Sequence, residues 1–191
     1  MSLKSQIIGL SGAVAVGFAA GLYVGISLEF NDAANPLSGP ASVYDGDTLT
    51  ITHGEEKFPV RIYAADAPEL RQTCGLGSER VPCGRMARDA VIALIADKDI
   101  ECEKIEDRDR YGRYVAVCFN HAGVDIGKSL IQQGLALEYS DYSDGRYSGV
   151  QSEAQRARRG LWAMDVMPPD QWRVCFTGRI AGRPADCPAQ P

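Results

Sequence analysis

The sequence has little of what a zinc protein needs. It contains only two histidines, and its six cysteines include no Cys-x-x-Cys pair. Zinc sites are built from clusters of these two residue types, so a zinc site is not expected. The chain also has no surplus of basic residues, because its formal net charge is -5 at pH 7. This charge argues against nucleic-acid binding over a broad basic surface and restricts any such contact to a local site.

Charged residues are absent from the apolar segment 7–28. A run of this length is sufficient to span a bilayer. Lys4 precedes the run and Glu29 follows it, which favours an outward-facing domain. The end of the run has no small-x-small cleavage pattern. We therefore predict that residues 1–30 form a signal anchor or transmembrane helix, with the domain in the periplasm or outside the cell. Secretion after signal cleavage is the alternative.

The cysteines that are present agree with export. Their number is even, and their spacing is not that of a metal site, which is typical of a disulfide framework. Disulfides persist in oxidising compartments, whereas free buried thiols in a cytosolic protein are the alternative interpretation. Pairing in sequence order closes three short loops and predicts disulfides between Cys74 and Cys83, Cys102 and Cys118, and Cys175 and Cys187.

Hydrophobic patterning divides the rest of the chain. Residues 31–40 are small, polar and proline-containing, as in a linker. One domain is expected over 41–163, followed by a C-terminal extension over 164–191 that we assign no function. Alternation and helical periodicity predict a hairpin at 43–63, strands at 100–104 and 114–119, and helices at 84–97, 125–134 and 152–164. This order indicates an α+β fold rich in β-structure, with a small closed barrel and packed helices.

Two neighbouring predicted strands concentrate carboxylates and arginine. Asp45 and Asp47 are two residues apart, so in an extended chain their side chains leave from the same side. Carboxylates held this close repel each other unless a cation or a proton lies between them. Arg61 and Arg113 add planar guanidinium groups that match phosphate oxygens. The pattern predicts a metal-assisted phosphodiesterase, although Asp-Gly-Asp alone also suits an ordinary turn, and the arginines also suit structural ion pairs.

Four motifs in order carry a resemblance to a known family. They are Asp-Gly-Asp-Thr at 45–48, Arg-x-x-x-x-Asp-x-Pro-Glu at 61–69, Asp-x-Tyr-Gly-Arg at 109–113 and Gln-Gly-Leu-Ala at 133–136. Over residues 41–162 the sequence resembles the staphylococcal nuclease, or thermonuclease, family. The resemblance implies an OB-fold five-stranded barrel with three helices. It also implies calcium-dependent hydrolysis of phosphodiester bonds in DNA and RNA with low sequence specificity, leaving 3′-phosphates.

The resemblance also implies a role for each matching residue. Asp47 and Asp66 fall on the calcium-ligand positions, and the backbone carbonyl of Ala67 is a further expected ligand. Carboxylate and carbonyl oxygens are the hard donors that Ca2+ prefers. Asp45 is expected to act indirectly, through a water molecule or by tuning the site. The expected ligand set leaves room for water and a substrate oxygen.

The catalytic positions are Glu69, Arg61 and Arg113. Glu69 is expected to act as the general base on an attacking water molecule. The two arginines are expected to hold the phosphate and to offset charge as phosphorus becomes five-coordinate. Arginine is a poor proton donor, so the sequence does not identify the group that protonates the leaving oxygen.

Three tyrosines are candidates for substrate binding: Tyr111, Tyr139 and Tyr142. Each could stack on a base or bind a neighbouring phosphate, and packing or surface roles are the alternative. The sequence departs from the family here, because Ser140 occupies one of two expected tyrosine positions. It also departs at 70–84, where Cys74 and Cys83 bracket the loop that follows the expected base.

Two other functions remain open from sequence. A noncatalytic OB-fold module would bind nucleic acid or protein without cutting. Its expected sign is loss of the acidic and arginine residues, whereas all five of these positions are filled here. A membrane-anchored interaction protein would use calcium only structurally. For the nuclease, the expected partners are DNA and RNA substrates and the membrane through the N-terminal helix. A monomer is favoured.

Overall fold

The computed structural model describes residues 37–176 and Cys187. The apolar segment 7–28 and the predicted helix over 1–30 lie outside these residues. Among the helices that are described, none is long and apolar enough to cross a bilayer. Most of the predicted linker 31–40 is also outside the described range.

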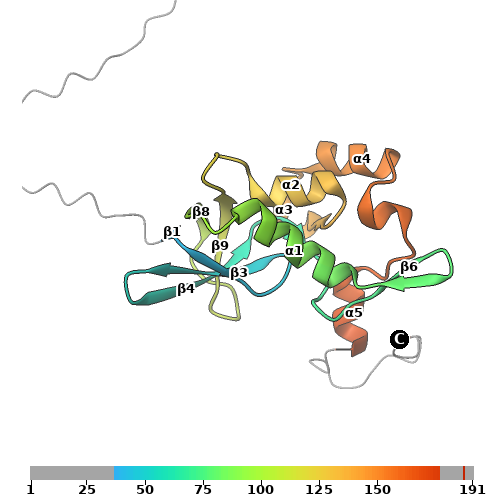
Figure 1. Cartoon of the computed structure of the whole chain (residues 1–191), viewed down its shortest axis with the longest axis horizontal. Coiled ribbons are helices and arrows are strands. Elements are labelled where there is room, and N and C mark those ends of the chain that lie inside the picture. Colours follow the sequence, from blue (N-terminus) through green and yellow to red (C-terminus); the bar gives the residue numbers. More distant parts are fainter. Residues whose placement is uncertain (1–36, 177–186, 188–191) are drawn as a thin grey trace, which may run out of the picture. The chain divides into compact units, whose positions relative to one another are not determined.

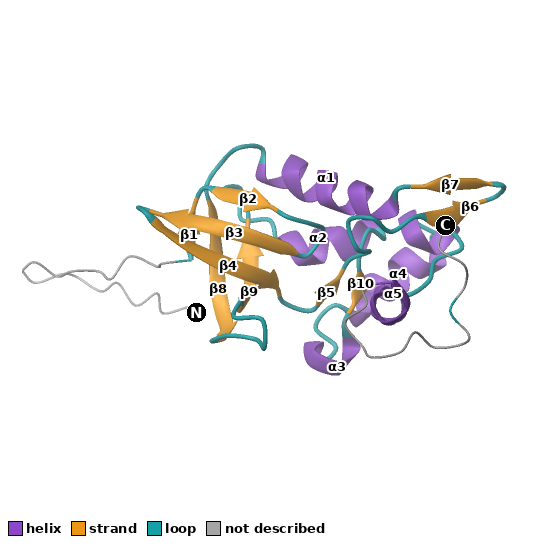
Figure 2. Ribbon diagram, turned by 90° about the horizontal axis from the view of Figure 1, so that it is seen from below, coloured by secondary structure: helices purple, strands orange, loops and turns teal. Residues whose placement is uncertain are grey.

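A six-stranded sheet forms the core of the fold, in the order β1-β8-β9-β4-β3-β2. Neighbouring strands are antiparallel except β4 and β9, which are parallel. Figure 2 shows these strands gathered at one end of the described part of the chain. Their bounds are β1 Ser38–Gly39, β2 Ala41–Val43, β3 Thr48–His53, β4 Glu56–Ile62, β8 Ile100–Glu106 and β9 Tyr114–Phe119.

The sheet closes on itself through its first two strands. Pro40 alone separates β1 from β2, while β1 pairs with β8 and β2 pairs with β3. Pro40 has no N–H to donate to a ladder, which explains the interruption at this point. Because one segment pairs with both ends of the sheet, the sheet closes into a small barrel, as the hydrophobic patterning predicts. The segment begins inside the predicted linker, since Leu37 is buried in the core.

Alternating residues of the strands fill the barrel. Leu49, Ile51, Val60 and Ile62 are fully buried, as the predicted hairpin requires. Helix α1 (Cys83–Ile95) covers the barrel with a buried face that includes Val91, and it matches the helix predicted at 84–97. Helix α2 (Ile126–Gln133) also matches its prediction. Its expected Asp125 cap accepts a hydrogen bond from Lys128 N, and its C-cap is Gly134.

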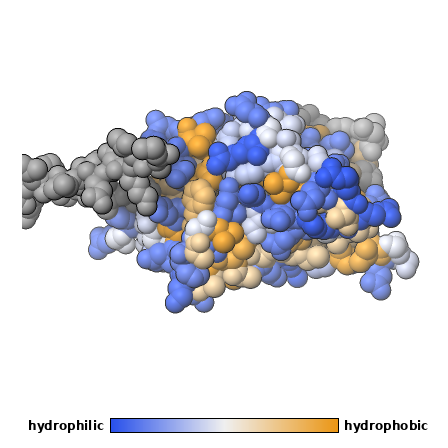
Figure 3. All heavy atoms as spheres, turned by 90° about the horizontal axis from the view of Figure 1, so that it is seen from above, coloured by the Kyte–Doolittle hydropathy of each residue, from blue (hydrophilic) through white to orange (hydrophobic). Residues whose placement is uncertain are grey.

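The remaining elements surround the ends of β4 and β9. Strand β5 (Ala65–Asp66) pairs with β10 (Leu137–Glu138), and β6 (Cys74–Leu76) pairs with β7 (Glu79–Val81). Figure 1 places α5 close to the start of β6 and α4 beyond α2. The face seen in Figure 3 is mostly hydrophilic, with hydrophobic residues in several smaller areas. The helical elements here are α3 (Ser140–Ser143), α4 (Ser148–Arg156), the 3-10 helix η1 (Gly160–Ala163) and α5 (Pro169–Phe176).

Two predictions about helices need correction. Three helices were expected, whereas the described part of the chain has five α-helices and one 3-10 helix. The helix expected at 152–164 ends instead at Arg156, and η1 follows. Arg158 and Gly160 have positive φ values of 51° and 52°, which a continuous α-helix does not allow. A Cβ at Gly160 would lie 2.4 Å from Gly134 O, so close packing requires glycine there.

All six cysteines lie among the described residues, and they form the three disulfides that the sequence predicts. Cys74 is bonded to Cys83, Cys102 to Cys118, and Cys175 to Cys187. The second of these joins register partners on β8 and β9. The first ties the start of β6 to the start of α1.

Candidate active site

The turn between β2 and β3 positions the first carboxylates. Asp45 Oδ1 accepts hydrogen bonds from Asp47 N at 3.1 Å and Thr48 N at 2.8 Å. Asp45 therefore stabilises the turn itself. Gly46 allows the turn to approach the neighbouring loop, since a Cβ there would lie 2.6 Å from the Cβ of Ala67. The side chain of Asp47 points inward and is 4% exposed.

Arg61 connects the two buried carboxylates. Its Nη1 forms an ion pair with Asp47 Oδ1, and its Nη2 lies 3.0 Å from Asp66 Oδ1. Nη2 also donates to Ala65 O at 2.9 Å. The side chains of Arg61 and Asp66 are 16% and 6% exposed. One planar fork thus holds two carboxylates from different segments of the chain.

Burial gives these groups unusual electrostatics. Burial is the largest influence on Asp47 and raises the pKa of that carboxyl above its usual range. The negative charges of Asp45 and Asp66 act in the same direction, whereas Arg61 and the Ala67 N–H act against them. Burial alone would lower the pKa of Arg61, but Asp47 and Asp66 raise it. At Asp47, burial and the neighbouring carboxylates therefore outweigh the effect of the Arg61 charge on the pKa.

A bend after β4 brings Asp66 beside Asp47. Ala64 has a positive φ of 61°, an unusual conformation for a residue with a side chain. Its carbonyl accepts a hydrogen bond from Tyr139 N at 2.9 Å, which holds the bend in place. Strand β5 follows at once, and Ala67 N then donates to Asp47 Oδ2 at 2.8 Å. The backbone on both sides of Asp66 is therefore fixed.

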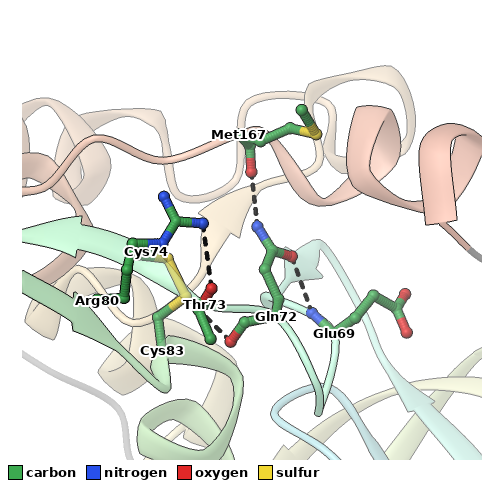
Figure 4. Close-up of a disulfide and its surroundings, with 7 residues drawn as sticks. All are labelled: Glu69, Gln72, Thr73, Cys74, Arg80, Cys83 and Met167. Atoms are coloured by element: carbon green, nitrogen blue, oxygen red, sulfur yellow. Dashed lines mark hydrogen bonds between the residues drawn. A yellow bond between two sulfur atoms is a disulfide. The ribbon is translucent and has the colours of Figure 1, made fainter. Parts of the chain in front are cut away.

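Glu69 extends from a loop that hydrogen bonds to Gln72 hold in place. Its N–H donates to Gln72 Oε1 at 3.1 Å, and Gln72 N donates to Glu69 O at 2.7 Å. Figure 4 shows its carboxylate pointing away from Gln72 and from the disulfide. Arg173 Nη1 lies 3.2 Å from Glu69 Oε1. The Glu69 side chain is 29% exposed, so it remains accessible to water.

Arg113 joins the same network through Thr48. Its Nε and Nη2 both donate to Asp109 Oδ2, at 2.8 and 2.7 Å. Its Nη1 donates to Thr48 Oγ1 at 2.9 Å, and that hydroxyl in turn donates to Asp47 Oδ1 at 3.1 Å. The side chain of Arg113 is 22% exposed.

The candidate tyrosines lie around these groups. Tyr139 and Tyr142 stack at a tilt, with ring centroids 5.0 Å apart, and Tyr142 is 61% exposed. Tyr139 and Asp66 both line a hollow of about 210 Å³. Tyr111 is also exposed, and the guanidinium carbon of Arg113 lies 5.3 Å from its ring centroid. Tyr111 and Tyr142 are thus exposed, whereas Tyr139 is only partly exposed.

The structure thus brings together residues from three of the four motifs, at 45–48, 61–69 and 109–113. Asp47, Asp66, Arg61, Glu69 and Arg113 belong to one network of ion pairs and hydrogen bonds, with Asp45 at its edge. The roles predicted for these residues and for the three tyrosines stay predictions.

Sequence reasoning assigned no role in the site to Thr48, Gln72 or Arg173, and it named Asp109 only as a possible ion-pair partner of the two arginines. Thr48 and Asp109 lie inside recognised motifs, so their positions were a usable signal. Gln72 and Arg173 contact the network from outside the motifs, and nothing local in the sequence indicates where their side chains point.

The donor set fits a hard divalent cation. Within residues 37–176 and Cys187, no group of three or more histidine, cysteine, aspartate or glutamate side chains is arranged around a common point. Asp47 and Asp66 supply two carboxylates instead. The guanidinium groups of Arg61 and Arg173 provide the positive charge beside them. Carboxylate oxygens of this kind suit Ca2+ when other oxygen ligands complete its shell. The Ala67 carbonyl as one of them stays a prediction.

Known proteins are similar to this chain in sequence. A family profile described as "Staphylococcal nuclease homologue" matches residues 59–164. The succinoglycan biosynthesis protein ExoI of Rhizobium meliloti is 35% identical over 156 residues, which are 80% of this chain and 77% of that protein. An uncharacterized endonuclease of Escherichia coli O157:H7 is 31% identical over 133 residues, 69% of this chain and 80% of that protein. A probable staphylococcal-like nuclease, CAN3 of Oryza sativa, is 30% identical over 119 residues, 61% of this chain and 29% of that protein.

Proposed function

Since this chain belongs to the staphylococcal nuclease family, we propose that it is a nuclease that hydrolyses phosphodiester bonds in DNA and RNA with low sequence specificity. One observation carries the proposal above all others: Arg61 holds two buried carboxylates, Asp47 and Asp66, on a single guanidinium. Arg173 is a second partner of Asp66, so two guanidinium groups neutralise two carboxylates that are costly to bury. Carboxylates grouped in this way beside the accessible Glu69 suit a site at which a divalent cation replaces part of the arginine charge.

We propose Ca2+ as that cation, with Asp47 and Asp66 as its protein ligands. Carboxylate chemistry and the family resemblance support this choice. When bound, the ion would supply positive charge to a phosphate oxygen. Asp45 would contribute indirectly, because its carboxylate is engaged by the backbone of the turn.

Side chains of the protein would supply the general base and the phosphate contacts. Glu69 is the accessible carboxylate of the site, and it would take a proton from the attacking water. Arg61 and Arg113 approach from β4 and the start of β9, and their N–H groups would hold the phosphate oxygens as negative charge develops. Resemblance to the family supports 3′-phosphate products. Such products leave 5′-hydroxyl ends, which a polynucleotide kinase labels without prior dephosphorylation.

Glu69→Gln tests the proposal with little change in shape. In the full oxidised chain, we expect calcium-dependent cutting of single-stranded DNA and RNA, abolished by a chelator. Loss of the base should lower turnover roughly a hundredfold or more, and Arg113→Ala should do the same by removing a phosphate contact. Glu101→Gln is the matched control, because Glu101 is an exposed carboxylate on β8. Nucleic-acid binding without cutting by the unaltered protein would instead favour a noncatalytic module.

We propose further that the domain works outside the cytoplasm as a monomer. Three disulfides support an oxidising compartment, and the uncharged segment 7–28 supports anchoring or export. Protease should digest such a domain once any outer membrane is permeabilised while the cytoplasmic membrane stays intact. Protection that ends only when the cytoplasmic membrane is lysed would contradict this placement.

A further inference from the structure

The C-terminal extension contacts the carboxylates of the site with the side chain of Arg173. Arg173 lies in α5, more than a hundred residues beyond Asp66 and Glu69 in sequence. Its Nη1 lies 3.0 Å from Asp66 Oδ1 and 3.2 Å from Glu69 Oε1, and its Nη2 lies 3.3 Å from Asp66 Oδ2. Arg173 therefore contacts both a proposed metal ligand and the proposed base.

The segment that carries Arg173 is anchored to the loop of the base. Gln72 is 1% exposed, and its side chain accepts from Glu69 N while donating to Met167 O at 2.7 Å (Figure 4). Asp165 and Gly75 form a β-bridge nearby, with backbone hydrogen bonds of 2.8 Å in both directions. The extension and the base loop thus form one hydrogen-bonded unit. Because Arg173 belongs to this unit, its position relative to Glu69 is defined.

The contacts of Arg173 differ from those of Arg113 in a way that matters for phosphate. Arg113 donates its Nε and Nη2 hydrogens to Asp109, and among the described residues no hydrogen bond or ion pair joins Arg113 to Glu69. Arg173 instead directs both terminal nitrogens at Asp66 and one of them at Glu69. A metal ion on Asp66 would compete with Arg173 for the carboxylate oxygens and would repel its guanidinium charge. The released N–H groups would then lie beside the base, where the attacked phosphate must also lie.

We propose that Arg173 is a third phosphate-binding arginine, supplied to the nuclease site by the C-terminal extension. The proposal rests on the function proposed above. Arg173 bridges Asp66 and Glu69 before substrate binds and donates to phosphate oxygens next to Glu69 afterwards. The extension is then part of the active site. Asp170 of α5 lines the same hollow as Asp66 and Tyr139, so α5 itself borders the site.

The test compares Arg173→Ala, Arg173→Lys and the control Arg156→Ala in the full oxidised chain. Arg156 is an exposed arginine on α4, so its loss removes the same charge away from the site. With saturating calcium, we expect Arg173→Ala to lower kcat/KM for single-stranded DNA about ten- to a hundredfold. Lysine should restore part of the loss, because it keeps the charge without the planar fork. The control should match the unaltered protein.

A second readout does not depend on turnover. In a Glu69→Gln background with calcium, fluorescence anisotropy should show about tenfold weaker binding of single-stranded DNA when Arg173→Ala is added, and no change with Arg156→Ala.

Circular dichroism checks folding, and Arg173→Gln replaces the alanine variant if that variant unfolds. If the unaltered protein does not cut, the nuclease proposal fails, and the affinity comparison still decides the role of Arg173. Unchanged affinity, or faster cutting by Arg173→Ala, would overturn the role and identify Arg173 as a group that merely covers the carboxylates.

Discussion

Arg61 and Arg113 differ in burial and in their partners, although both belong to the same network. Arg61 is nearly buried and is shared between Asp47 and Asp66. Arg113 is more exposed and is aligned by a carboxylate of its own, Asp109. A guanidinium whose one edge is fixed can present its other N–H groups in a constant direction. Asp109 is therefore a positioning residue for Arg113.

The electrostatics of Asp109 predict how stability changes with acid. Burial would raise the pKa of Asp109, but hydrogen bonds from the side chain and backbone of Arg113 and from Tyr111 N lower it below its usual value. A lowered pKa in the folded state stabilises the protein when the carboxylate is ionised. This stabilisation is fully present above the unfolded-state pKa and is lost as pH falls through the lower folded-state pKa.

Asp109→Asn should therefore lower the free energy of unfolding at neutral pH but not in strong acid. The pair is partly screened by water, so we expect a difference of about 1 kcal/mol at about pH 7. Urea unfolding of both proteins as pH falls below about 4 should show the two curves converging. A difference that is constant over the whole range would mean that the carboxylate charge contributes nothing.

At the scale of elements, strand pairing brings the site residues together. Thr48 and Arg61 are register partners on β3 and β4, and the parallel pairing of β4 with β9 brings Arg113 to the same end of the barrel. Helix α1 then approaches the loop of the base. A Cβ at Gly84, in the first turn of α1, would lie only 1.8 Å from Glu69 O. Glycine at this position sets how closely the helix and the loop approach.

Gly84→Ala should separate α1 from this loop. Overpacking of this kind destabilises by about 1 to 3 kcal/mol, and the displaced Glu69 should lower turnover in addition. Gly149→Ala is the matched control, because Gly149 lies in α4 and a Cβ there meets no atom within 4 Å. The control should be neutral or stabilising by up to about 1 kcal/mol. Urea unfolding and turnover of both variants check this; similar behaviour of the two would contradict it.

The elements also show which features local sequence can predict. Asp125 and Gly134 mark the ends of α2 correctly, because a cap and a left-handed stop act within one turn of helix. The end of α4 was misplaced, since it depends on packing between Gly160 and Gly134. The barrel and most of the site came from ordered motifs. Arg173 was missed because its partners are distant in sequence and no periodic pattern encodes such a contact.

At the scale of the whole molecule, the three disulfides restrain three different parts. Cys102 and Cys118 are fully buried within the barrel, on paired strands. Cys74–Cys83 holds the loop that follows Glu69 against the start of α1. Cys175–Cys187 closes a loop that begins two residues after Arg173. One disulfide thus restrains the barrel, one the base loop and one the extension. Removing each disulfide should therefore have a separate effect.

The barrel disulfide should govern global stability, and the disulfide of the extension should govern the site. Replacing Cys102 and Cys118 by alanine should lower the free energy of unfolding by about 3 kcal/mol, because a short closed loop is released in the unfolded chain. Replacing Cys175 and Cys187 should leave the unfolding of the barrel nearly unchanged, since neither residue belongs to its core. It should instead raise KM for single-stranded DNA, because α5 then holds Arg173 less firmly. Urea unfolding and steady-state kinetics on both pairs, beside the unaltered chain, separate the two effects. A large loss of barrel stability without any change in KM after removal of Cys175–Cys187 would show that the extension supports the fold rather than the site.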